Sequence, residues 1–208
     1  MTLVSAFRRR YGRETQEGIF WKEAHMRIIG GALRGRRFMS VPEGVRPTAD
    51  RTRQAIFNIM VHRFQGEDWT LDKARVLDVF AGTGAMGFEA LSRGAAHVSF
   101  IDSSTAARAG ITAHARAFNL TRQSTILAHD ALRPPRTTLA CTLAFLDPPY
   151  DSDDAAPALA ALQVTGWLTP GALCVIEHRT LFVPPPGFRV ADARVYGKTT
   201  VLFVWAPG

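Results

Sequence analysis

Residues 143–151 read LAFLDPPYD, an apolar run that ends at an acid, two prolines and a tyrosine. Proline has no amide N–H and a fixed φ, so the run ends here as a strand and the chain beyond it is stiff. Asp147, the carbonyl of Pro148 and the ring of Tyr150 should therefore face one small volume. Two acceptors and an aromatic face suit a flipped nucleobase that presents an exocyclic amine.

An amine on a purine ring is a poor nucleophile, because its lone pair is delocalised into the ring. Acceptors that hold both N–H groups would turn the lone pair toward an electrophile, and such alignment can supply roughly 7–11 kcal/mol. Asp147, Pro148 and Tyr150 are therefore the predicted catalytic residues. The alternative for Asp147 is a turn cap.

A glycine-rich stretch, VLDVFAGTGAMGFEA, lies upstream at 76–90. Gly82, Gly84 and Gly87 satisfy G-x-G-x-x-G, which by itself is a weak signal shared by several nucleotide-binding classes. Asp78 lies inside the preceding strand, where its charge would repel a pyrophosphate but suits a ligand with an ammonium group and a positive sulfur. Asp102, 20 residues after Gly82, is placed to accept ribose hydroxyls.

The elements that must position these residues alternate from Ala74 onward. Strands that alternate with helices predict a doubly wound, mainly parallel sheet that binds ligands at the carboxyl ends of its strands. Asp78, Asp102, Asp130 and Asp147 all follow or end such strands. The expected strands are 74–80, 97–102, 124–128, 139–146 and 172–177, with a closing antiparallel hairpin around Gly197, and the expected helices are 84–94, 105–119 and 154–163.

The chain before this core has a different character. Residues 27–41, RIIGGALRGRRFMSV, predict a β-hairpin, and residues 46–64 predict a helix with Thr48 or Asp50 as N-cap. We therefore divide the chain into an extension (1–25), a basic segment (26–68) and a core domain (69–208). His62 and His114 are expected on helix surfaces.

The formal net charge of +7 comes from the N-terminal part. Residues 1–63 contain 13 Lys and Arg against 5 Asp and Glu, whereas residues 64–208 contain 12 against 13. Such asymmetry fits a polyanionic partner or, equally, a solvated basic face. The candidate phosphate and base contacts are Arg34, Arg36, Arg37, Arg46, Thr48, Arg51 and Arg53, although Thr48 and Arg51 could instead cap or brace the helix.

FAGTGAMGFEALSRGA and FLDPPY together resemble S-adenosylmethionine-dependent amino-methyltransferases. RIIGGALRGRRF and RPTADRTRQAIFN narrow the resemblance to the bacterial 16S ribosomal RNA (guanine-N2)-methyltransferase family, from about Met26 to the C-terminus. The resemblance implies a Rossmann-like class I fold with seven strands and a guanine in small-subunit rRNA as target. The implied cofactor-binding residues are Asp78, Phe80, Ala81, Gly82, Gly84, Asp102, Ser103, Asp130, Ala131 and Asp147.

Several alternatives stay open at this stage. A DNA adenine-N6 methylase or a protein glutamine methylase would keep the same pocket, although a typical DNA enzyme carries a recognition insertion for which this chain has no room. A nicotinamide-dependent oxidoreductase conflicts with Asp78, and a non-catalytic RNA-binding module conflicts with the intact strand-end acids. Residues 1–25 have no counterpart in the family pattern and are either a genuine extension or the product of an upstream start codon.

Composition sets the remaining expectations. No apolar run approaches the roughly 18 residues of a membrane span, no metal-ligand cluster is evident, and Cys141 and Cys174 look like core thiols. We expect a cytoplasmic monomer without a metal. Its expected partner is 16S rRNA, either free or within a partly assembled subunit.

Overall fold

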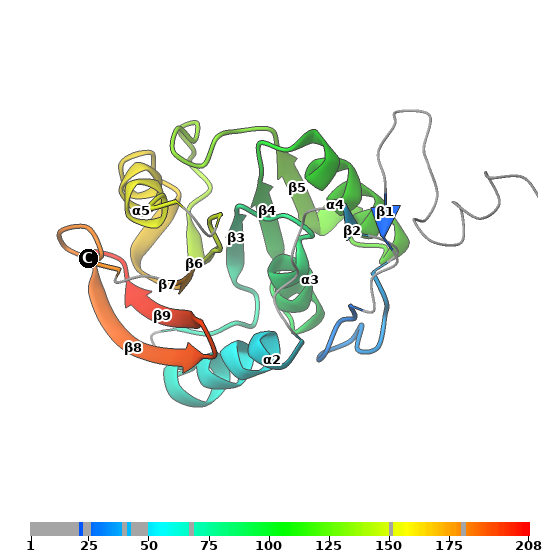
Figure 1. The fold of residues 1–208 in the computed structure, drawn as a ribbon, viewed down its shortest axis with the longest axis horizontal. Coiled ribbons are helices and arrows are strands. Elements are labelled where there is room, and N and C mark those ends of the chain that lie inside the picture. The colour runs from blue at the N-terminus through cyan, green and yellow to red at the C-terminus, as the bar shows by residue number, and fades with distance from the viewer. Residues whose placement is uncertain are drawn as a thin grey trace, which may run out of the picture.

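The computed structural model describes residues 21–22, 26–38, 41–42, 50–66, 69–149, 152–179 and 182–208. Its centre is a seven-stranded sheet with the order β5-β4-β3-β6-β7-β9-β8 (Figure 1). Neighbouring strands from β5 to β7 are parallel, whereas β9 runs antiparallel to both β7 and β8. The predicted doubly wound, mainly parallel sheet is confirmed. Its strands are β3 (Arg75–Val79), β4 (His97–Ile101), β5 (Ser124–Leu127), β6 (Cys141–Leu146), β7 (Leu168–His178), β8 (Arg189–Tyr196) and β9 (Thr199–Trp205).

The strand order reverses between β3 and β6. The chain runs outward from β3 through β4 to β5 and then returns to β6 on the other side of β3. Open α/β sheets bind ligands at such a switch point, outside the carboxyl ends of the strands. Val79 is in register with Leu146, so Asp78 and Asp147 come from the two strands that flank this point.

Helices cover both faces of the sheet because its strands alternate between two apolar sides. Val76 packs with the helices before β6, whereas Leu77 packs with the helix after it. The first group comprises α2 (Asp50–Ile59), which continues into the π-helix η1 (Met60–Phe64), and also α3 (Ala85–Ser92) and α4 (Thr105–Ala117), the latter followed by the short 3₁₀ helix η2 (Thr121–Gln123). α5 (Ala155–Val164) covers the opposite face.

The predicted hairpin is interrupted, and one of its strands lies before the basic segment, in residues 1–25. Two-residue strands β1 (Trp21–Lys22) and β2 (Val41–Pro42) pair antiparallel, and Arg27 pairs with Arg37 as an isolated bridge. The turn between them passes close to α3. A side-chain carbon at Gly31, where φ is +73°, would lie 1.8 Å from the Ser92 carbonyl oxygen, so only glycine fits there.

Strand β7 starts earlier than predicted. Its predicted beginning is Ala172, yet the strand begins at Leu168 and includes Pro170 and Gly171. Gly171 has a φ of +69°, and the pairing with β6 shifts register between Cys141 and Leu143. The turn-like residues therefore form an irregularity within one long strand.

His114 is buried, so its expected place on a helix surface is wrong. It is 1% exposed and lies among three phenylalanines, in edge contact with Phe38 and Phe88 and stacked on Phe118. Burial lowers the pKa of His114 to about 4, although a hydrogen bond with the backbone of Thr83 opposes the shift. The neutral imidazole therefore acts as a core side chain.

The two cysteines are core thiols, as predicted. Cys141 and Cys174 are free and buried, and burial raises the pKa of each thiol to about 12. No helix in the described part of the chain is long and apolar enough to cross a membrane.

Candidate active site

The glycine-rich loop joins β3 to α3 and needs unusual backbone angles. Gly82 and Gly84 have positive φ values of 53° and 74°, and Phe80 has a φ of 56° although it is not glycine. A non-glycine residue with a positive φ costs free energy, and such residues cluster at ligand-binding sites. Gly87 has a different task, because a side-chain carbon there would lie 2.4 Å from the Phe100 ring. The third glycine thus lets α3 pack closely on β4.

Asp78 lies beneath this loop with its carboxylate fixed by α3. It is buried, and its Oδ2 accepts a hydrogen bond of 2.9 Å from the amide N–H of Gly87. Burial raises the pKa of Asp78 well above its ordinary value, and the nearby charges of Asp147 and Asp102 add to this effect, whereas the Gly87 amide opposes it. A bound cation would relieve this repulsion.

Asp102 follows β4 and holds two neighbouring segments together. Its Oδ2 accepts a hydrogen bond of 2.7 Å from the Gly82 amide, and its Oδ1 accepts one of 2.8 Å from the Ser104 amide. A carboxylate has about four lone-pair positions, so acceptor capacity remains for a ligand. Asp102 therefore shapes the glycine loop and retains acceptor capacity for a ligand.

The other predicted cofactor residues lie along the same edge of the sheet. Asp130 is exposed and its Oδ1 accepts a hydrogen bond of 2.9 Å from the Leu132 amide, which fixes a turn beyond β5. Ala131 is buried within this turn, and Ser103 is exposed beside Asp102. Ala81 is buried and accepts a hydrogen bond of 2.7 Å from the Gly84 amide, which closes the glycine loop.

The motif that follows β6 borders a pocket. Asp147 is half-buried, Pro148 is buried and Pro149 is exposed, whereas Tyr150 lies outside the described residues. The pocket extends from this motif across the end of β7 to the start of β9. It is lined by Asp147, Pro148, Pro149, Ser152, Glu177, His178, Arg179 and Thr199.

Sequence reasoning missed part of this lining. For the strand-end residues Glu177 and His178 the sequence favours a structural hydrogen bond over a contact with the pocket, and it does not single out Arg179, Ser152 or Thr199. The end of β7 gives a usable signal, because β7 neighbours β6 and its carboxyl end must lie beside Asp147. Thr199 gives no such signal, since it reaches the pocket through the antiparallel hairpin.

The basic segment presents some of the predicted arginines to solvent. Arg34, Arg36, Arg37 and Arg51 are exposed, and Nη1 of Arg36 donates a hydrogen bond of 3.0 Å to the carbonyl of Ala117 at the end of α4. Arg46 and Thr48 lie outside the described residues.

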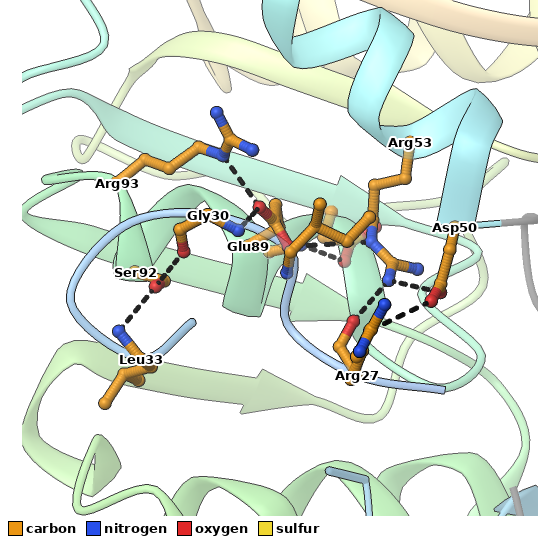
Figure 2. Close-up of polar contacts among 11 residues, drawn as sticks. Arg27, Gly30, Leu33, Asp50, Arg53, Glu89, Ser92 and Arg93 are labelled. Carbon is orange, nitrogen blue, oxygen red and sulfur yellow. Dashed lines mark hydrogen bonds and ion pairs between the residues drawn. The ribbon is translucent and has the colours of Figure 1, made fainter. Parts of the chain in front are cut away.

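Arg53 is not available to RNA, which corrects its prediction as a phosphate contact. Its side chain is fully buried, with Nη2 2.6 Å from the Arg27 carbonyl oxygen and 2.9 Å from Oδ1 of Asp50, and with Nε 3.6 Å from Oε2 of Glu89 (Figure 2). Position 53 faces inward because it shares the apolar stripe of Ile56 and Phe57 on α2. Arg53 thus joins the basic segment to the core.

Glu89 on α3 is the centre of this buried network. Its carboxylate accepts hydrogen bonds of 2.8 Å from the amides of Ile29 and Gly30 and one of 2.7 Å from Nε of Arg93 (Figure 2). One turn further, the Ser92 hydroxyl accepts from the Leu33 amide and donates to the Gly30 carbonyl. The 26–38 loop is therefore docked on the helix that begins at the glycine-rich loop.

No group of three or more His, Cys, Asp or Glu side chains suitable for a metal occurs in the described ranges. The candidate site thus consists of the acids Asp78, Asp102 and Asp147 at the carboxyl ends of β3, β4 and β6, together with the pocket beside Asp147. The exposed basic loop, residues 26–38, is fixed to α3, the helix that begins at the glycine-rich loop.

Comparison with known proteins identifies the family that this chain resembles. The family model "Conserved hypothetical protein 95" matches residues 26–205. Ribosomal RNA small subunit methyltransferase D of Haemophilus influenzae is 32% identical over 161 residues, which cover 74% of this chain and 79% of that protein. The putative rRNA methyltransferase YlbH of Bacillus subtilis is 32% identical over 158 residues, which cover 74% of this chain and 82% of that protein.

Solved structures agree with this assignment. The putative methyltransferase yhhF from Escherichia coli superposes with a TM-score of 0.75 at 28% identity, and the match covers 88% of this chain and 98% of that one. The Rossmann-like class I fold is thereby confirmed. The chain belongs to the conserved hypothetical protein 95 family, together with the ribosomal RNA small subunit methyltransferase D proteins.

Proposed function

We propose that this protein transfers a methyl group from S-adenosylmethionine to the exocyclic N2 amine of one guanine in 16S rRNA. The observation that carries the proposal is the placement of Asp78, Asp102 and Asp147 at the carboxyl ends of the neighbouring strands β3, β4 and β6. Burial raises the pKa of Asp78, and the charges of Asp147 and Asp102 add to the rise. Such a site favours a ligand with positive charge. One relative named as a small-subunit rRNA methyltransferase and another named as a putative rRNA methyltransferase support the RNA target.

The residues of the cleft fit this cofactor. The buried carboxylate of Asp78 beneath the glycine loop suits the ammonium group of its amino-acid part, whereas Asp102 and the turn at Asp130 suit its ribose and adenine. When bound, S-adenosylmethionine supplies an electrophilic methyl group on a positive sulfur. Asp147 and the Pro148 carbonyl then hold the two N–H groups of the target amine and turn its lone pair toward that methyl group.

The basic loop supplies the affinity for RNA in this proposal. Arg34, Arg36, Arg37 and Arg51 are exposed, and guanidinium groups suit phosphate oxygens. We place the reaction in the cytoplasm, with the substrate presented as 16S rRNA alone or within a partly assembled subunit, and with the protein acting as a monomer. Tyr150 completes the site as the stacking surface for the flipped base.

Two experiments test this proposal, one on the rRNA of a strain that lacks the gene and one on variants of the purified protein. Mass mapping of rRNA nucleosides should show one N2-methylguanine missing in a strain that lacks the gene, and the purified protein should restore it. Asp147→Ala should abolish single-turnover methyl transfer while S-adenosylhomocysteine affinity changes little, because the hydrogen bond to the amine matters in the transition state. Asp147→Asn keeps an acceptor and should retain part of the rate.

Asp78→Ala serves as the opposite control. It should weaken S-adenosylhomocysteine binding by roughly 1.5–3 kcal/mol, since it removes a charged acceptor from the cleft. Full methyl transfer by Asp147→Ala would exclude the proposed alignment. If Asp147 were only a turn cap, its removal would cost about 0.5–2 kcal/mol of stability and leave turnover per folded molecule intact.

A further inference from the structure

Glu177 lines the same pocket as Asp147, the residue proposed to hold the target amine. Leu146 and Ile176 are register partners in the parallel pair of β6 and β7, so Asp147, just past the end of β6, lies beside Glu177, which is still in β7 and pairs with Val201 of β9. Parallel strands are about 4.8 Å apart. Both residues line the same pocket, and Glu177 is partly buried there.

The face of the sheet on which Glu177 lies is set by alternation along β7. Leu173 and Val175 pack in the cluster under α2 and α3, whereas Cys174 and Ile176 pack in the opposite cluster under α5. Glu177 continues the first series. Asp78 belongs to that same side of β3, because its carboxylate meets the amide of Gly87 on α3. Glu177 and the cofactor cleft therefore share one side of the sheet.

The atoms that flank an exocyclic amine differ among the bases. In guanine the N2 amine lies beside N1–H, a donor. In adenine the N6 amine lies beside N1, an acceptor, and in cytosine the N4 amine lies beside N3, also an acceptor. A carboxylate next to the amine-holding residue would accept from guanine N1–H but would oppose the lone pair of adenine or cytosine.

We propose that Glu177 is a specificity-determining residue that accepts a hydrogen bond from N1–H of the target guanine while Asp147 holds its N2 amine. This inference rests on the proposed function and adds a physical reason for the choice of guanine among bases with an exocyclic amine. Sites built to pair with a polar group of the substrate discriminate strongly against an analogue that lacks it, because the buried protein group then loses its partner.

The sharpest test uses 2-aminopurine, which keeps the N2 amine but has an unprotonated N1. After the methylated nucleotide has been mapped, small-subunit rRNA is ligated from synthetic segments that carry either guanine or 2-aminopurine at that position. The wild-type protein should methylate the guanine RNA with a kcat/KM about 100-fold or more above that of the 2-aminopurine RNA. Equal values for the two RNAs would overturn the proposal without any variant.

Glu177→Gln then tests the residue itself. The amide oxygen still accepts from guanine, whereas the amide NH₂ donates to the N1 lone pair of 2-aminopurine, so the preference should shrink to within about tenfold. A merely structural role would lower both rates together and leave their ratio unchanged. Asp153→Asn is the matched control, since Asp153 is an exposed acid near the motif that does not line the pocket, and its ratio should equal the wild-type ratio.

Calorimetry with S-adenosylhomocysteine separates the remaining outcomes. Its affinity should be unchanged in Glu177→Gln, and a marked loss would assign Glu177 to the cofactor and overturn the proposal. If Glu177→Gln does not fold, the ratio of the two kcat/KM values is measured with Glu177→Ala instead. The wild-type comparison of the two RNAs tests the proposal in either case. If the wild-type protein methylates no RNA, the proposed function fails, whereas guanine methylation with an unchanged ratio in Glu177→Gln overturns only the role of Glu177.

Discussion

Two arginines on α2, two residues apart, should respond to substitution in opposite ways. Arg53 is fully buried against Glu89, whereas Arg51 is exposed. Arg53→Met keeps an unbranched apolar stem but removes the guanidinium group, with its charge and the hydrogen bonds of its Nη2 to Arg27 and Asp50. Arg51→Met removes the same charge from the same helix and is therefore a matched control.

The magnitude follows from what remains around Glu89. Removal of one partner of a buried ion pair costs about 3–5 kcal/mol. Glu89 still has Arg93 and the amides of Ile29 and Gly30, so we expect the lower end, about 3 kcal/mol of unfolding free energy. Arg51→Met should change stability by less than about 0.5 kcal/mol, because it is exposed.

Urea denaturation measures the stability change, and hydrogen exchange of the 26–38 amides measures whether the loop stays docked. Arg53→Met should accelerate exchange in this loop, whereas Arg51→Met should lower RNA affinity at low salt and leave exchange unchanged. A stability loss below about 1 kcal/mol for Arg53→Met would refute the buried-pair argument. A larger loss of stability in Arg51→Met than in Arg53→Met would refute the assigned orientation of α2.

The other predictions concern His114 and the basic loop. Because the pKa of His114 is about 4 in the folded protein and about 6.5 when unfolded, the unfolded chain takes up the proton first as pH falls. Stability is complete above about pH 6.5 and should fall by about 3 kcal/mol toward pH 4, and denaturation of His114→Gln should show a flatter pH profile. Neutralising Arg34, Arg36 and Arg37 should reduce the slope of log RNA affinity against log salt by roughly one unit for each phosphate that the protein no longer binds. The affinity for S-adenosylhomocysteine should not change. An unchanged slope would mean that RNA binds to another surface of the protein.

The sheet was predictable because its pattern is local. Each strand from β3 to β6 is a short apolar run, and each is followed by an acid or glycine loop that marks the ligand edge. Parallel topology then determines which acids lie near one another, so the sequence alone predicts that Asp78, Asp102 and Asp147 are neighbours. The electrostatic effect of these acids on Asp78 agrees with that placement.

The errors arise where a residue's surroundings come from distant segments. Arg53 looks like a phosphate ligand within RPTADRTR, and only the Glu89 carboxylate, 36 positions later, makes it a core residue. His114 looks like a polar residue on a helix until Phe38 of the basic segment closes over it. In both cases the missing partner belongs to the interface between the basic segment and the core, which no local pattern encodes.

That interface connects the 26–38 loop to the glycine-rich loop through α3. Helix α3 begins at the glycine loop, donates the Gly87 amide to Asp78, and two residues later presents Glu89 to the basic segment. The residues at both ends are buried, and the helix spans only eight residues, so it has little room to bend. The positions of the glycine-rich loop and of the arginines in the 26–38 loop are therefore linked through one short helix. Under the proposed function, RNA bound by the 26–38 loop would be held at a set position relative to the cofactor, and a loosened loop should weaken methyl transfer before it weakens cofactor binding.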